Sequence, residues 1–179
     1  MNQAEHDMLV IDAQDGSRGA LDALVRHHHR DLLRFAYSLC RDTALAQDAV
    51  QDAWIKVARR LRTLEDPRAF RGWVYHAVRW RVGDLVRRAH RSDRPLDGAE
   101  AAPDCSADRD RGIDLAAAIA GLPKIERQGL QLFYVSGLTI PEIAVVLEIP
   151  VGTVKSRLHR ARGLLKEHFD GEDHERRRS

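Results

Sequence analysis

The chain has 179 residues, which is enough for one or two small domains. Its side chains are 44% hydrophobic and 31% charged, and 29 basic residues against 27 acidic ones leave a formal net charge of +2, a composition typical of a globular protein. The sequence has no apolar run of about 18 residues that could cross a membrane, no basic and apolar secretory signal at its start, and only two cysteines, Cys40 and Cys105. We therefore expect a cytoplasmic protein without membrane insertion or a disulfide framework, and a Cys40–Cys105 redox bridge stays open as an alternative.

The first half of the chain is predicted to consist of helices. A polar N-terminal arm, 1–19, precedes apolar residues that recur at helical spacing, first over 20–39 and then over 43–61. Asp66 followed by Pro67 is typical of a helix start, and the third helix is expected to run from there to residue 91. No alternating strand pattern of useful length appears in this half.

The character of the chain changes over residues 92–112. This segment holds two prolines, two glycines and almost no large apolar side chains, and six acidic residues against three basic ones give it a net charge of −3. Such a segment cannot bury enough surface to order itself, so we expect a flexible acidic linker. Further helices are predicted after it at 113–121, 124–136, 139–147 and 151–168. The fold class is thus all-α, with two small helical domains at 20–91 and 113–169 and a charged tail at 170–179.

The last two predicted helices have the pattern of a helix-turn-helix, because a three-residue turn joins them and the second one is basic. Val154 and Leu158, four residues apart, are expected to face the core, and free backbone amides near Gly152 and Thr153 could hold a phosphate. The first turns of a recognition helix meet base edges in the major groove. The alternative is a basic solvated surface helix. The candidate DNA contacts are Thr153, Lys155, Ser156, His159, Arg160 and Arg162.

Positive charge and aromatic residues coincide between residues 59 and 91. Ten arginines against three acids give a net charge of +7. Arginine neutralises phosphates and aromatic rings stack on unpaired bases, so the combination favours a DNA strand being held open. For Phe70 and Trp73 a position in the core is the alternative. The candidate contacts are Trp73, Tyr75, His76, Arg79, Trp80, Arg87 and Arg88.

A polar face is predicted on the second helix. Asp48, Gln51 and Asp52 lie at positions i, i+3 and i+4, which places them side by side. A solvated helix face is one interpretation of this pattern. A docking patch for a basic protein partner is the other.

Neither a metal site nor a catalytic site is expected. His27, His28 and His29 are consecutive, and consecutive helical residues point about 100° apart, so they cannot chelate one ion together. Zinc-site spacing, a Gly-rich phosphate loop and a nucleophile elbow are missing from the sequence. We therefore expect no enzyme activity, no cofactor and no bound metal.

Three segments, in their order along the chain, resemble the extracytoplasmic-function (ECF) group of bacterial RNA polymerase sigma factors. The family segment that docks on the clamp helices of the polymerase β′ subunit is similar to QDAVQDAWIKVARRL. The segment that melts and reads the −10 element is similar to PRAFRGWVYHAVRWRVGDLVRRAHR. The −35-reading helix-turn-helix is similar to LTIPEIAVVLEIPVGTVKSRLHRARGLLKE. The likeness covers about residues 20–168.

The resemblance implies a sigma factor that binds core RNA polymerase through the β′ clamp and the β flap. It implies that 20–91 correspond to sigma region 2 and 113–169 to region 4, which recognise the −10 and −35 elements of promoter DNA and help to open the duplex. Asp48, Gln51 and Asp52 become the contacts to polymerase. The resemblance further implies a linker threaded towards the RNA exit path, an anti-sigma factor as partner, and a monomer when free.

One position departs from the family pattern. Many members carry Asn where this chain has Trp80, in a motif of the form W-L-Y-R-I-A-x-N. A tryptophan cannot make the hydrogen bonds of an amide but can stack on a base, so we do not expect a polar contact there.

A second class of protein also fits the C-terminal half. A stand-alone helix-turn-helix regulator with an N-terminal dimerisation or sensor domain would explain the recognition helix. It would leave the arginine- and aromatic-rich helix unexplained. Such a regulator would dimerise and bind duplex DNA alone.

Overall fold

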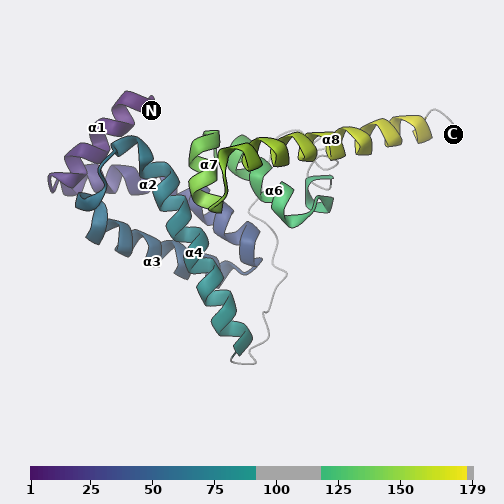
Figure 1. Cartoon of the computed structure of the whole chain (residues 1–179). Coiled ribbons are helices and arrows are strands. Elements are labelled where there is room, and N and C mark those ends of the chain that lie inside the picture. The colour runs from purple at the N-terminus through teal and green to yellow at the C-terminus, as the bar shows by residue number, and fades with distance from the viewer. Residues whose placement is uncertain (92–117, 177–179) are drawn as a thin grey trace. The chain divides into compact units, whose positions relative to one another are not determined.

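The computed structural model describes residues 1–91 and 118–176, and the elements of these ranges are helices and short helical turns, without a strand (Figure 1). The all-α fold class is therefore confirmed. The chain divides into two compact units, with the N-terminal helices in the first and the recognition helix in the second. No helix within the described ranges is long and apolar enough to span a membrane. The predicted linker at 92–112 and the start of the helix expected from residue 113 lie outside the described residues.

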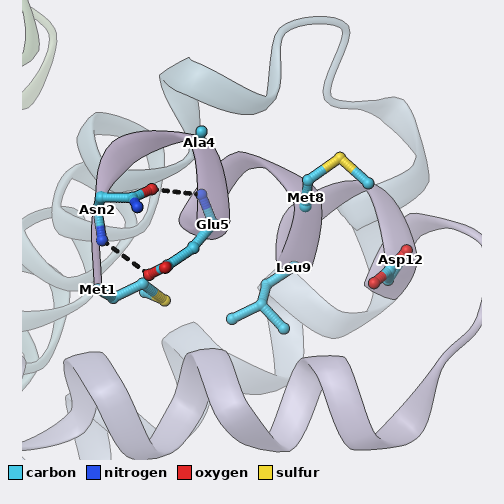
Figure 2. Close-up of a pocket in the computed structure, with 7 residues that line it drawn as sticks. All are labelled: Met1, Asn2, Ala4, Glu5, Met8, Leu9 and Asp12. Carbon is cyan, nitrogen blue, oxygen red and sulfur yellow. Dashed lines mark hydrogen bonds between the residues drawn. The ribbon is translucent and has the colours of Figure 1, made fainter.

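The predicted polar arm at the N-terminus is wrong, because it forms helix α1 (Gln3–Gln14). Asn2 and Glu5 close a capping box (Figure 2): the Asn2 side-chain oxygen accepts from the Glu5 amide at 2.8 Å, and Glu5 accepts from the Asn2 amide at 3.0 Å. Only His6 and Val10 of α1 are buried. Two buried positions make no recurring apolar stripe, and this is why helical periodicity did not reveal α1.

Helices α2 (Arg18–Cys40) and α3 (Thr43–Arg60) agree closely with the predicted ranges. A two-residue connection separates them. Arg41 adopts the left-handed conformation (φ 57°) that ends α2, and its amide donates to the Tyr37 carbonyl at 2.7 Å. Asp42 then caps α3 by accepting from the Leu45 amide at 2.9 Å.

Helix α4 (Phe70–Arg91) follows two short 3-10 turns, η1 (Leu61–Thr63) and η2 (Pro67–Ala69). Asp66 caps η2 by accepting from the Arg68 amide at 3.0 Å, so the predicted start at Asp66 is right but its first turn is 3-10. α3 packs against both α2 and α4. Their apolar faces form the core of the first unit: Leu24, Leu32, Phe35, Val50, Val57, Phe70, Val74, Tyr75 and Val78.

The described part of the second unit begins with a short helical stretch at residues 118–121, followed by α6 (Lys124–Leu130). The helix predicted over 124–136 is not uniform, because Gln131–Val135 form a π-helical turn, η3. The Ser136 amide donates to the Gln131 carbonyl at 3.0 Å, a span of five residues. Gly137, at φ 61°, then ends the element in the left-handed conformation, as expected for a glycine at this position.

The helix-turn-helix consists of α7 (Ile140–Leu147) and α8 (Val151–Arg176). Thr139 caps α7, as predicted, through a reciprocal pair in which Glu142 accepts from the Thr139 amide at 2.6 Å and Thr139 from the Glu142 amide at 3.4 Å. The three-residue turn is present, and Glu148 in it has φ 56°. α8 continues through most of the predicted tail, to Arg176, so the end expected at residue 168 is wrong.

Candidate nucleic-acid interface

The recognition helix α8 has one buried face and one exposed face. Val154 and Leu158 are 1% and 3% exposed, which confirms their predicted orientation into the core, and Ala161 continues that face. The side chains predicted to contact DNA lie away from the core: Thr153 is half-buried, and Lys155, Ser156, His159, Arg160 and Arg162 are exposed. Residues at i, i+4 and i+7 lie above one another on a helix, so one exposed stripe holds Lys155, His159 and Arg162.

Two backbone amides at the start of α8 already donate hydrogen bonds within the protein. The Thr153 amide donates to the Pro150 carbonyl at 2.9 Å, and the Val154 amide donates to the same oxygen at 3.1 Å. The prediction of a free amide at Thr153 is therefore wrong, because the first turn of the helix takes up that donor. The Ser156 hydroxyl donates to the Thr153 carbonyl at 3.0 Å and keeps its lone pairs for an external donor.

Two arginines of the exposed face have partners that the sequence did not reveal. Arg160 Nε lies 3.7 Å from Oε1 of Glu126, a carboxylate of α6 that is only 8% exposed. Arg162 Nε donates to the Tyr134 hydroxyl at 2.9 Å, and its guanidinium carbon lies 5.6 Å from the centre of the Tyr134 ring. Both partners precede the helix-turn-helix in sequence. The sequence around Glu126 is rich in charged and polar residues and carries no signal that this carboxylate is buried.

The aromatic residues of α4 separate into a buried and an exposed set. Phe70 is fully buried, which confirms the core alternative for it, and Tyr75 is only 1% exposed. The prediction of Tyr75 as a DNA contact is therefore corrected: its ring packs at 5.3 Å from the Phe35 ring, inside the unit. Trp73 is half-buried and Trp80 is 50% exposed. Trp73 and Trp80, seven residues apart, share one side of α4.

Trp80 is in contact with a cation from the neighbouring helix. Lys56 Nζ of α3 lies 4.8 Å from the centre of the Trp80 ring, within the range of a cation–π interaction. His76 and Arg79 of α4 are half-buried. Trp73, His76 and Trp80 follow one another at i, i+3 and i+7, so these three side chains can present a continuous surface.

The acidic face of α3 is divided between an internal ion pair and exposed groups. Asp52 Oδ2 accepts from Arg81 of α4, at 2.7 Å from Nε and 2.5 Å from Nη2. Asp84 joins the cluster by accepting from Arg81 Nη1 at 2.7 Å, and it pairs with Arg88 at 3.1 Å. Asp52 therefore links α3 to α4. Of the three predicted docking residues, Asp48 and Gln51 are exposed, and the ion-paired Asp52 side chain is 42% exposed.

An apolar groove lies between α2 and α3 beside Gln51. Its lining includes Ile55, which is 43% exposed. The other lining residues are Val25, His29, Leu33, Gln47, Gln51 and Trp54. The groove is therefore continuous with the exposed polar face of α3.

The histidine triplet and the cysteines form no metal or redox site within the described residues. His28 is buried while His27 and His29 are exposed, so the three side chains diverge as predicted. The described residues contain no group of three or more side chains able to hold a metal ion. Cys40 has a free thiol whose pKa is raised by burial, and Cys105 lies outside the described residues.

Two family models match the chain. The model of Sigma-70 region 2 matches residues 24–92, and that of Sigma-70 region 4 matches residues 113–165. The first match includes the ion-paired helices α3 and α4, and the second includes the helix-turn-helix. α1 lies outside both.

Several curated proteins are similar over most of the chain. The RNA polymerase sigma-H factor of Pseudomonas aeruginosa is 32% identical over 90% of this chain and 92% of its own length. The ECF RNA polymerase sigma factor SigM of Mycobacterium tuberculosis is 33% identical over 84% of this chain and 77% of its own. The ECF sigma factor SigE of Mycolicibacterium smegmatis is longer: it is 32% identical over 89% of this chain, which spans 66% of its length.

Solved structures agree with these matches. CnrH, in complex with the cytosolic domain of CnrY, is 26% identical with a TM-score of 0.66, over 93% of this chain and 97% of that one. The sigma factor RpoE of Bartonella quintana, in complex with the anti-sigma factor NepR, is 26% identical with a TM-score of 0.61, over 83% and 97%. With the two Sigma-70 regions in order and relatives above 30% identity along most of their length, the chain belongs to the ECF RNA polymerase sigma factors.

Proposed function

We propose that this sigma factor binds core RNA polymerase and directs it to promoters through two DNA contacts, one for the −35 element and one for the −10 element. In this proposal 20–91 act as region 2 and 113–169 as region 4, with the acidic segment 92–112 between them. The observation that carries the proposal is the exposed basic stripe on α8, which follows directly on a helix-turn-helix turn. Its chemistry is that of DNA binding, since it offers cations and hydroxyls on a face with no core role.

Recognition of the −35 element is assigned to the first turns of α8. Lys155, Ser156 and His159 lie on its exposed face within three turns of the helix start. Arg160 is held near Glu126 while most of its side chain stays exposed, so it can reach a base edge with limited loss of side-chain entropy. Thr153 and Arg162 flank this set and fit phosphate contacts.

Opening of the −10 element is assigned to the exposed side of α4. Trp73 and Trp80 supply aromatic surface, and Trp80 is the better stacking platform because half of it is open. Arg79, Arg87 and Arg88 supply the positive charge that holds the strand, and His76 lies between the tryptophans. Tyr75 has no part in this surface because it is buried.

Docking on the β′ clamp is assigned to Asp48, Gln51 and the adjacent groove between α2 and α3. Asp52 contributes by fixing α3 against α4 through Arg81. Two structural relatives are solved in complexes, one of them with an anti-sigma factor named as such. An anti-sigma factor that covers these docking surfaces is therefore also proposed for this chain, along with a free monomer and a further polymerase contact at the β flap.

The first experiment is co-migration of the purified chain with bacterial core RNA polymerase on a sizing column. Asp48→Arg should reduce the fraction bound at least tenfold, because it places a cation on the face that meets a basic partner. Asp12→Arg is the matched control, since it makes the same charge change on the exposed side of α1 and should bind like the unmodified chain.

The same column tests the alternative function. A free monomer that shifts into the polymerase peak supports the proposal. A free dimer that ignores polymerase and binds duplex DNA alone would overturn it in favour of a stand-alone regulator.

A further inference from the structure

Arg162 is held between two elements of the second unit. Its Nε donates to the Tyr134 hydroxyl at 2.9 Å, and its guanidinium carbon lies 5.6 Å and 5.8 Å from the ring centres of Tyr134 and Phe133. Tyr134 is 61% exposed. A tyrosine this exposed adds little to a core, so its contact with an arginine on the predicted DNA face calls for another explanation.

The backbone explains why two adjacent aromatic residues can both reach Arg162. Phe133 and Tyr134 belong to the π-helical turn η3, in which the Ser136 amide bonds to the carbonyl five residues earlier. The hydrogen bond of a π turn spans one residue more than that of an α-helix, and this shifts the side chains around the helix axis. Such single π turns occur frequently at functional sites.

The hydrogen bond leaves the end of the guanidinium available. An arginine has five N–H donors, and Tyr134 takes the one on Nε. The four donors on the two Nη atoms form a planar fork that matches phosphate oxygens. Contact with two rings limits the rotation of the side chain, so less entropy is lost when a phosphate binds.

The position along α8 indicates the kind of DNA group that Arg162 meets. Base edges are read by the N-terminal residues of a recognition helix. Arg162 is eleven residues after Val151, roughly 16 Å along the axis at about 1.5 Å per residue. It lies in the same exposed stripe as Lys155 and His159, so it faces the DNA beyond the bases that the first turns read.

We propose that Tyr134 is a positioning residue that holds Arg162 for a contact with a backbone phosphate flanking the −35 element. The inference rests on the proposed function, because it requires α8 to bind the −35 element. It adds a residue of η3, outside the helix-turn-helix, to the determinants of promoter affinity.

The test uses the holoenzyme and a short duplex that the unmodified holoenzyme selects from a random pool. Arg162→Ala should weaken binding about fivefold and lower the slope of log affinity against log salt by about 0.9, the value for one phosphate contact. Tyr134→Phe removes the hydroxyl and keeps the ring, and it should weaken binding about threefold, which lies at the lower end of the net contribution of one hydrogen bond because the hydroxyl acts on the phosphate only through Arg162. The same change in the Arg162→Ala background should have no further effect.

The variants distinguish a failure of the positioning role of Tyr134 from a failure of the proposed −35 contact by α8. Equal effects of Tyr134→Phe in both backgrounds, or tighter binding by that variant, would overturn the positioning role. Lys155→Ala and Arg160→Ala serve as the reference for α8. If these two and Arg162→Ala all leave binding unchanged, the assignment of α8 to the −35 element fails, whereas an unchanged result for Arg162→Ala alone overturns only the inference. Unfolding midpoints should be the same for Tyr134→Phe and the unmodified chain.

Discussion

Tyr75 and Trp80 show how five residues along a helix separate two roles. Both belong to the aromatic set of α4, yet Tyr75 is 1% exposed and Trp80 is 50% exposed. At about 100° per residue they lie on different sides of the helix. Composition placed both among the DNA contacts, and only the packing of α2 and α3 against α4 shows which of them is in the core.

This difference predicts opposite effects of substitution. Tyr75→Ala should lower the free energy of unfolding by about 3–5 kcal/mol, since it leaves a large cavity in the core. Trp80→Ala should change it by less than about 1 kcal/mol and should instead reduce promoter opening by the holoenzyme. Urea unfolding and permanganate reactivity of the −10 region measure the two effects. A larger stability loss for Trp80→Ala than for Tyr75→Ala would contradict the exposure of Trp80 and the burial of Tyr75.

The three polar residues of α3 also differ at the residue scale. Asp52→Asn should lower the free energy of unfolding by about 1 kcal/mol, because it weakens the charged hydrogen bonds to Arg81 at a site that is partly screened by solvent. Asp48→Asn should leave stability unchanged, since Asp48 is exposed. Equal unfolding midpoints for the two variants would show that the Asp52–Arg81 ion pair between α3 and α4 does not contribute to the free energy of unfolding.

At the scale of elements, α1 is attached to the first unit by a pair of buried histidines. His6 Nε2 lies 2.9 Å from His28 Nε2 of α2, and both rings pack near Phe70 of α4. Burial is the main cause that lowers the pKa of His28 from 6.5 to about 3, and repulsion of the protonated ring by the Arg71 guanidinium lowers it further. Burial also lowers the pKa of His6, against a raising contribution from Asp7. The pair is therefore neutral in the folded protein at pH 7.

The contribution of this pair to stability is expected to disappear in acid. In the unfolded chain the His28 imidazole takes up a proton below pH 6.5, while in the folded chain it does so only near pH 3. The contribution of His28 to the free energy of unfolding is thus fully present above pH 6.5. It decreases as the pH drops below 6.5, by at most about 1.4 kcal/mol per pH unit for one group. Urea unfolding and amide hydrogen exchange in α1 between pH 7.5 and 5 would measure the loss.

A double variant provides the control for this pH dependence. His6→Leu together with His28→Leu removes both titrating groups and keeps apolar volume in the site. Its stability should vary less between pH 7.5 and 5 than that of the unmodified chain. The same pH dependence in both proteins would assign the effect to other groups.

At the scale of the whole molecule, the net charge is only +2, but the charged residues are distributed unevenly along the chain. Residues 59–91 carry +7, and the predicted linker carries −3. The positive charge lies largely in α4, where Arg87 and Arg88 are exposed even though Asp84 is near both. We therefore expect promoter affinity to depend steeply on salt.

Replacing both arginines tests this expectation. Arg87→Ala with Arg88→Ala should lower the slope of log affinity against log salt by about 2 for the holoenzyme on duplex promoter DNA, or somewhat less on a melted strand. Arg26→Ala, on the exposed side of α2, should leave the slope unchanged. A slope that the double variant does not alter would remove these residues from the DNA interface.

The sequence by itself determined the helical class, the ranges of α2 and α3, the turn of the helix-turn-helix and the outward direction of the α8 cations. Each of these depends on local signals, namely apolar spacing and capping residues, which act within a few turns of one helix. The core positions of Val154 and Leu158 were predictable for the same reason.

Only the tertiary structure decided which polar groups find partners. Asp52 with Arg81, Glu126 with Arg160, Tyr134 with Arg162 and His6 with His28 are pairs separated by 22 to 34 residues, in different elements. α1 likewise depends on two buried residues that gain their packing from α2. The spacing of apolar residues predicts which face of a helix is buried. Which polar group a side chain meets on another helix depends on how the helices pack against one another, and the sequence of one helix does not determine that packing.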